Sequence, residues 1–254
     1  MSNVVALTFK EYKHKFWQRA QTLGFATQDN FSPLSINEIY ESAASLPIVF
    51  IRQEESFLLA ALQGLNLNQN LFLNDKNMWS GMYCPEGYSY YPFCIADHDG
   101  KGIVCERTGS DLISETSRGN AFFDDHGEKS SEFNALIQEL TQYHNGLNRA
   151  AELTKELVQS ELLIEWPIEF ERAGKKTTLR GVHRIDESKL NTLSYSQFGS
   201  LRDSGALAIC YGQLVSMFNL KYLKYLHSIK GNTANIDNDS LDFDSGGSLN
   251  FDNL

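Results

Sequence analysis

Residues 130–158 read SSEFNALIQELTQYHNGLNRAAELTKELV, and this stretch decides the fold class. Apolar residues recur in it at steps of three and four, starting with Phe133, Leu136 and Leu140. This spacing predicts a single amphipathic helix of about seven or eight turns, since a turn takes 3.6 residues. A helix of that length can lie across a sheet.

The chain before this helix is predicted to be mainly antiparallel β-structure. Short apolar runs alternate there with polar turns, the pattern that indicates strands and hairpins. Ser35 and Glu38 form a capping box that starts one short helix, which should end before Pro47. The predicted strands cover residues 3–8, 47–52, 57–65, 70–74, 89–97 and 101–107.

After the long helix, residues 161–170 and 177–185 predict a second strand pair around a turn at Glu171–Lys176. Two helices should follow, near 194–203 and from about 206 to 227, separated by Gly205 in a positive-φ position. Strands first and helices later indicate an α+β domain over residues 1–230. Its predicted architecture is an antiparallel sheet packed against one long amphipathic helix and the C-terminal helices.

Residues 231–254 have a different composition, with five aspartates and no lysine or arginine. They also repeat a Leu-x-Phe-Asp motif, at 241–244 and 249–252. The simpler interpretation is a disordered acidic tail, because so few apolar residues cannot build a core. The alternative is a docking motif, in which Phe243 and Phe251 anchor in a basic, apolar groove.

The composition excludes several classes of protein. The chain has 254 residues, 42 % of them hydrophobic, and a formal charge of −10. That charge argues against a nucleic-acid-binding surface, which needs clustered lysine and arginine. None of the four cysteines forms a CxxC pair, and no signal peptide or membrane-spanning stretch is visible. A cytoplasmic protein that does not span a membrane is therefore expected.

The segment from Met78 to Phe93 is the most unusual, because aromatic residues crowd into it. They either close the core beneath a sheet edge or line a groove for a peptide or protein client. For the second interpretation the candidate client-binding residues are Trp79, Tyr83, Tyr88, Tyr91 and Phe93, together with Phe243 and Phe251 of the tail.

Catalytic chemistry has little support in the sequence. There is no GxSxG, SxxK or phosphate-binding glycine loop, and no cofactor site is predicted. His98 and His126 lie in aspartate-rich turns and are the weak candidates for a metal site. The same turns form for purely local backbone reasons, so a catalytic metal remains the less favoured interpretation.

Motifs in both halves of the chain resemble those of the SapC-like family of bacterial proteins. In the first half these are 46–50, 61–65, 70–73, Trp79, 91–93 and 122–128; in the second they are 165–167, 179–187, 190–193 and 201–208. The resemblance covers about residues 4–227. His126 departs from it, since the family usually has an acidic or small polar residue there, and the tail lies outside it.

The resemblance implies a context rather than a reaction. The family is named for an association with surface-layer secretion, and its members occur beside TonB-dependent receptors, cupin-type oxygenases and flavin-dependent tryptophan halogenases. The family has no established catalytic residues that could be assigned to positions of this chain. We therefore expect a non-enzymatic accessory protein that recognises a peptide or protein client in a secretion or protein-modification pathway. The alternatives are a metal-assisted enzyme and a surface-layer structural component.

Overall fold

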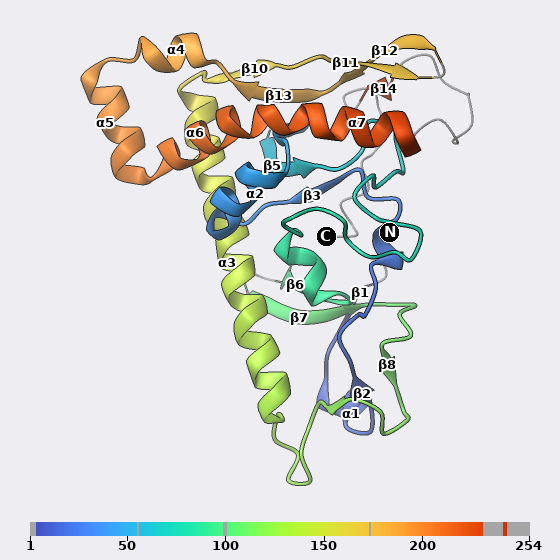
Figure 1. The fold of residues 1–254 in the computed structure, drawn as a ribbon. Helices are drawn as coiled ribbons and strands as arrows, with labels where there is room; N and C mark the ends of the chain where they lie inside the picture. Colours follow the sequence, from blue (N-terminus) through green and yellow to red (C-terminus); the bar gives the residue numbers. More distant parts are fainter. Residues whose placement is uncertain (1–3, 55, 99–100, 173, 231–240, 243–254) are drawn as a thin grey trace. The chain divides into compact units, whose positions relative to one another are not determined.

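The computed structural model describes residues 4–54, 56–98, 101–172, 174–230 and 241–242, and it confirms the α+β class (Figure 1). These residues form two compact units. Unit 1 takes the described residues within Met1–Gln21 and Glu86–Asn145, and unit 2 takes those within Thr22–Pro85 and Gly146–Gly247. The predicted long helix is α3, Ser131–Gln159, and it contributes its first half to unit 1 and its second half to unit 2.

Unit 1 contains two small antiparallel sheets and two short helical segments. The predicted hairpin across residues 89–107 is present, because Ile95 of β6 pairs with Val104 of β7. The sheet orders are β1-β7-β6 and β8-β2-β9. The elements are β1 Val4–Ala6, α1 Phe9–Tyr12, β2 Phe16–Trp17, η3 Glu86–Tyr90, β6 Phe93–His98, β7 Lys101–Arg107, β8 Ile113–Ser114 and β9 Asn120–Ala121.

An aromatic cluster forms the core of unit 1. Phe122 is fully buried and meets the ring of Phe133 from α3 edge-on, with 5.0 Å between ring centroids. Trp17 packs edge-on against Phe93 at 5.5 Å. Edge-to-face pairs of this kind add about 0.5–1.5 kcal/mol beyond the burial of area. The first turns of α3 are therefore held by the apolar positions that the sequence pattern marks.

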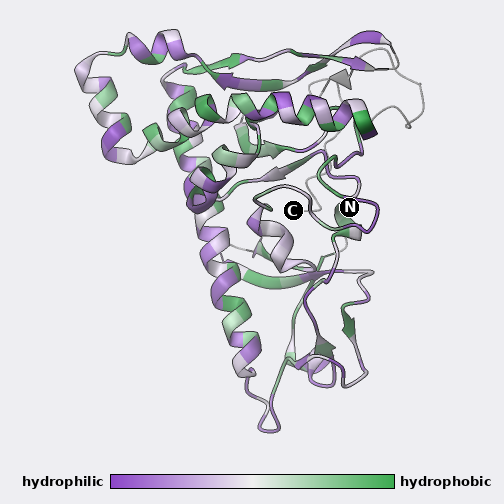
Figure 2. Cartoon of the chain, viewed as in Figure 1, coloured by the Kyte–Doolittle hydropathy of each residue, from purple (hydrophilic) through white to green (hydrophobic). Residues whose placement is uncertain are grey.

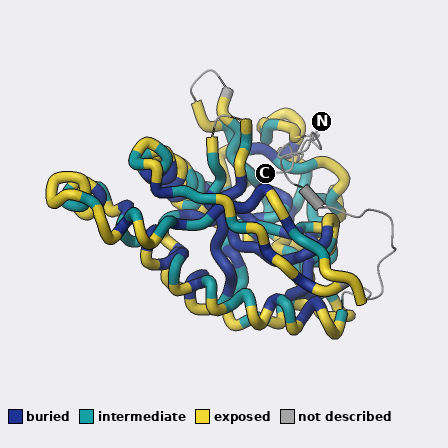
Figure 3. Tube along the Cα trace, turned by 90° about the horizontal axis from the view of Figure 1, so that it is seen from above, coloured by how far each residue is buried: buried dark blue, intermediate teal, exposed yellow. Residues whose placement is uncertain are grey.

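Unit 2 is built on a five-stranded antiparallel sheet in the order β10-β13-β4-β5-β3. The central hairpin joins β4 and β5, with Val49 opposite Ala60. Four successive residues of β4, 48–51, are fully buried, so both faces of this strand are covered. Buried segments accordingly follow the inner strands in Figure 3, while the outer turns of the helices are exposed. The strands are β3 Phe31–Pro33, β4 Ile48–Gln53, β5 Ser56–Leu62, β10 Leu163–Glu165 and β13 Val182–Ile185.

Helices flank this sheet. The capping box at Ser35 and Glu38 is present, and the helix that follows it ends before Pro47, as predicted. Gly205 has φ 93° and separates the two predicted C-terminal helices. The helical segments of unit 2 are η1 Gly24–Ala26, η2 Ile36–Glu38, α2 Ile39–Ser45, α4 Glu187–Asn191, α5 Tyr195–Ser204, α6 Ala206–Ser216, η4 Met217–Asn219 and α7 Leu220–Lys230.

Two strand predictions need correction. Residues 70–74 form no strand, and only an isolated bridge joins Leu73 to Trp79. The strand pair around Glu171–Lys176 exists, but it is divided between two sheets. β11 (Ile168–Arg172) and β12 (Lys175–Arg180) form a separate hairpin, whereas β10 and β13 join the main sheet. The breaks fall at Pro167, which lacks an amide hydrogen, and at Gly181, which has φ 77°.

The tail lies almost entirely outside the described residues. Its described part is β14, Leu241–Asp242, whose backbone pairs in parallel with Leu179 and Arg180 of β12. Phe243 and Phe251, two of the predicted client-binding residues, lie outside the described range.

Candidate functional site

A row of large apolar side chains faces solvent along α6, η4 and α7, which follow one another in nearly one line (Figure 1). We call this row the α6–α7 stripe. Its members are Tyr211, Val215, Phe218, Tyr222, Tyr225 and Ile229, exposed by 42–74 %. They alternate at steps of four and three residues, the spacing that places side chains on a single helix face.

The exposed apolar area of the stripe lies at the upper end of the range found for the largest patch of a monomer. Its six side chains present on the order of 600 Å², if about half of the 150–250 Å² of a large apolar side chain is exposed at each position. The largest apolar patch of an ordinary monomer covers about 300–600 Å² and is often functional. Figure 2 shows green, hydrophobic segments along the same helices. A patch at the upper end of this range is a candidate binding surface.

Polar side chains on the opposite face fix the rotation of α6. Gln213 is fully buried and bridges two strands: its Nε2 donates to the carbonyl of Ile48 at 3.2 Å, and its Oε1 accepts from the amide of Ile185 at 3.0 Å. Ser216 Oγ accepts from the amide of Ile48 at 2.9 Å. Buried polar groups must be paired, so α6 keeps this face on the sheet and presents the stripe outward.

A close helix contact supports the same orientation. Gly212 lies on the buried face of α6, where a Cβ would come 2.7 Å from the Cγ2 of Ile39 on α2. Glycine therefore permits the two helices to approach each other. Further along, Asn219 Nδ2 donates to the carbonyls of Ala43 and Leu46 at 2.8 and 3.2 Å. Both contacts hold the inner face and leave the outer face uncovered.

An aromatic row extends the stripe to Trp79. The ring of Trp79 stacks on Phe72, with 5.0 Å between centroids and 10° between planes. Phe72 contacts Tyr222 at 6.1 Å, and Tyr222 stacks near Tyr225 at 6.3 Å. A Cβ on Gly81 would lie 2.8 Å from the Nε1 of Trp79, so the loop needs glycine there. Trp79 is half-buried, and the fully buried Phe72 links its ring to Tyr222 of the stripe.

The helices that carry the stripe are basic. Residues 206–230 contain Lys221, Lys224 and Lys230 but no aspartate or glutamate. Lys221 is exposed, and its Nζ lies 5.7 Å from the ring centroid of Phe218. Lys230 Nζ donates to the carbonyls of Leu71 and Leu73 at 3.2 and 3.1 Å. The surface therefore combines apolar rings with positive charge, which suits an acidic, amphipathic ligand.

The other predicted client-binding residues are placed differently. Tyr83 is half-buried in unit 2, and its hydroxyl donates to the buried carboxylate of Glu38 at 2.9 Å. Tyr88 and Phe93 are only 8 % and 5 % exposed and belong to unit 1 with the half-buried Tyr91. The aromatic segment is thus divided between the two units. Tyr88 and Phe93 are buried, as the core interpretation expects.

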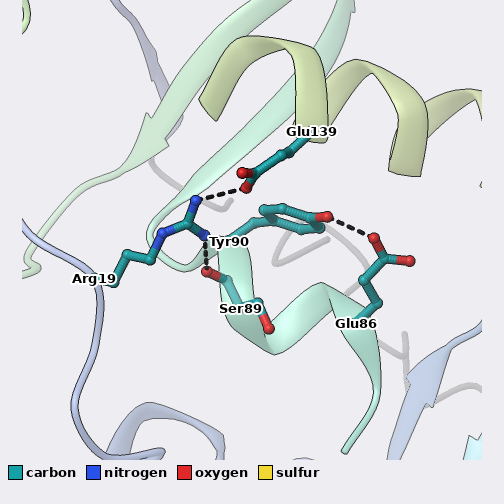
Figure 4. A network of polar contacts seen from close by, with 5 residues as sticks. All are labelled: Arg19, Glu86, Ser89, Tyr90 and Glu139. Carbon is teal, nitrogen blue, oxygen red and sulfur yellow. Dashed lines mark hydrogen bonds and ion pairs between the residues drawn. The ribbon is translucent and has the colours of Figure 1, made fainter. Parts of the chain in front are cut away.

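A polar network in unit 1 holds η3 in place (Figure 4). Arg19 donates to Glu139 of α3 at 2.5 Å and to the carbonyl of Ser89 at 3.2 Å. Tyr90 donates to Glu86 at 2.5 Å. Burial, with this hydrogen bond, raises the pKa of Tyr90, so its hydroxyl stays protonated and acts as a structural donor.

Cys105 and Cys210 are buried, and Cys84 and Cys94 are half-buried. Burial is the main cause that raises the pKa of Cys84 and Cys210 to about 12 and also raises the pKa of Cys94 and Cys105. The thiolate is the nucleophile in cysteine chemistry. None of these four groups is therefore poised for nucleophilic attack near neutral pH.

The geometry of the described residues gives the metal-site hypothesis no support. Among the described residues, no group of three or more histidine, cysteine, aspartate or glutamate side chains is placed to hold a metal ion. His126 is exposed in a turn where its amide donates to Asp124 at 2.9 Å. The side chain of His98 lies outside what the structure describes.

The comparisons with known proteins identify the class of protein. The family model of SapC matches residues 7–223, and the chain belongs to this family. No curated protein and no solved structure matches the chain. Within the described residues, no helix combines the length and apolar character needed to cross a membrane.

The sequence interpretation missed the α6–α7 stripe. It treated residues 206–227 as one nearly all-apolar helix, and a helix that is apolar on every side gives no sign of which side is buried. The sequence did contain a usable signal. All four tyrosines and phenylalanines of residues 206–227 fall on positions spaced by four and three residues, the spacing of one helix face.

Proposed function

We propose that this SapC family member is a non-enzymatic accessory protein that binds a peptide or protein client on the α6–α7 stripe and Trp79. One observation carries the proposal: six large apolar side chains are exposed along the stripe while the inner face of the same helices is held by buried hydrogen bonds. An amphipathic client segment would remove these side chains from water, at about 25 cal/mol per Å² of apolar area.

The charge of the surface specifies the client further. Lys221 and Lys224 flank the stripe, and no acidic residue lies within 206–230. We therefore expect the client segment to be acidic, with apolar residues repeated at helical or extended spacing. The client would belong to a cytoplasmic secretion or protein-modification pathway, with a flavin-dependent halogenase, a cupin-type oxygenase or a TonB-dependent receptor component as candidates.

A capture experiment with matched variants tests this proposal. Full-length protein and the variant Phe218→Asp/Tyr225→Asp are immobilised and exposed to lysate of the native host, and bound proteins are quantified. Carboxylates on the stripe repel an acidic, apolar client, so the double variant should lose its client by at least about tenfold, which corresponds to 1.4 kcal/mol.

The control is Tyr195→Asp/Ser196→Asp, which adds the same two negative charges at two exposed residues of α5. This variant should capture the client as the parent does. Equal capture by parent and double variant would exclude the stripe as the client site.

A further inference from the structure

The chain itself contains a segment with the chemistry that the stripe requires. Residues 231–254 carry five aspartates and no lysine or arginine, whereas residues 206–230 carry three lysines and no acidic residue. The two regions are neighbours in sequence and opposite in charge. Opposite charges within a few ångströms attract, and the attraction strengthens next to apolar side chains.

The tail also supplies apolar anchors. Each Leu-x-Phe-Asp motif places leucine and phenylalanine two residues apart, at 241/243 and 249/251. In an extended chain such residues share a face, and the residues between them point the other way. Leu249 and Phe251 can thus enter the stripe together while Asp252 remains near its lysines.

The described part of the tail lies on the same unit as the stripe. β14 pairs with β12, β12 pairs with β11, and β11 contacts α7. His227 of α7 makes a 3.2 Å hydrogen bond between its Nε2 and the carbonyl of Glu171 on β11. Residue 242 therefore lies two strands from β11, about 10 Å at the usual spacing of strands.

The chain beyond β14 is long enough to reach the stripe. Phe251 is nine positions beyond Asp242, a stretch that can span about 30 Å when extended. The stripe is about 27 Å long, because 18 steps of 1.5 Å along the helix separate its first and last residues. Phe251 can therefore reach the α7 half of the stripe.

We propose that the second motif of the tail, residues 248–252, docks on the α7 half of the α6–α7 stripe in the same molecule. The docked tail occupies the surface to which we assign client binding, so this inference rests on the proposed function for its biological meaning. It makes the tail an internal competitor that an acidic client must displace. A second copy of the chain is the less suitable occupant, because pairing two stripes would bring like-charged lysines together.

Photo-crosslinking in the full-length chain tests the docking directly. Phe251→p-benzoylphenylalanine is irradiated at low protein concentration, and the crosslinked peptides are identified by mass spectrometry. We expect monomeric protein in which residue 251 is joined to a peptide from 218–229. Lys221→Glu/Lys224→Glu should lower this yield by about fivefold or more, because two attractive charge pairs become repulsive. Lys10→Glu/Lys13→Glu changes the net charge equally, at an exposed residue of α1 and at its exposed C-cap, and should leave the yield unchanged.

Other crosslinks would overturn the proposal. Crosslinks to regions other than the stripe, or none within the chain, would show that the tail does not dock there. A crosslink at dimer mass would show that a second copy is the occupant. The two proposals can fail separately. If client capture depends on Phe218 and Tyr225 but no crosslink forms, only the tail docking is excluded. If the crosslink forms but client capture does not depend on these two residues, only the client site is excluded.

Discussion

The side-chain amide of Gln213 on α6 donates to the carbonyl of Ile48 on β4 at 3.2 Å, although the two residues are 165 positions apart. The same side chain accepts from the amide of Ile185 on β13. One fully buried glutamine thus links a helix to two neighbouring strands. This bridge orients the helix and thereby decides which side chains of α6 face solvent.

Gln213→Leu should destabilise the fold. The variant leaves the Ile48 carbonyl and the Ile185 amide without their side-chain partner in a buried position, which costs about 1–3 kcal/mol for each group. We expect the free energy of unfolding in urea to fall by about 2–6 kcal/mol. Gln142→Leu is the control, since Gln142 is exposed on α3 and its replacement should change stability by no more than about 0.5 kcal/mol. Equal losses in both variants would contradict the bridging role.

Gly146→Ala should destabilise the junction between α3 and the start of η2. A Cβ at this position would overlap the Oγ of Ser35, the atom that caps η2 by accepting from Asn37. Moving the cap should cost about 1–3 kcal/mol, and thermal unfolding measures the loss. Gly199→Ala in α5 meets no atom within 4 Å, so it should instead stabilise the protein by up to about 1 kcal/mol. A neutral Gly146→Ala would mean that this close approach does not exist.

Phe218→Ser/Tyr225→Ser should leave the stability of the chain nearly unchanged. Both side chains are exposed, by 74 % and 58 %, so their removal creates no cavity. The free energy of unfolding should change by less than about 0.5 kcal/mol for each residue. Leu223→Ala, on the buried face of the same helix, should cost about 2–5 kcal/mol. A large loss in the stripe variant would show that these aromatic residues are part of the core.

The thiols of Cys84 and Cys210 should resist alkylation at pH 9 in the native protein. Burial raises the pKa of both to about 12, against about 8.5 for a free thiol. Iodoacetamide should therefore modify them at least a hundredfold more slowly than it does in urea, because the thiolate reacts. The folded state binds these protons more tightly than the unfolded state does. Stability is therefore retained below the unfolded pKa and falls as the pH rises toward 12. Equal rates in the native and denatured states would contradict the raised pKa values.

Several elements followed directly from local sequence signals. The periodicity of residues 130–158 predicted α3, and the Ser35–Glu38 capping box predicted the start of η2, which leads into α2. Gly205 marked the end of α5. Each signal acts over one or two turns of chain, so it needs no tertiary context. Residues 70–74 were misassigned as a strand because a short apolar run has no periodicity of its own and its partner lies elsewhere in the chain.

The sequence by itself determined the family, the α+β class, the long amphipathic helix and the acidic character of residues 231–254. Only the tertiary structure decided that Tyr88 and Phe93 are buried and that Phe218, Tyr222 and Tyr225 are exposed. The reason is physical: a helix that is apolar on all sides gains nearly the same free energy from burying any face. Its orientation is then set by the few groups that must be paired or closely packed, here Gln213, Ser216 and Gly212, whose partners come from distant strands and helices.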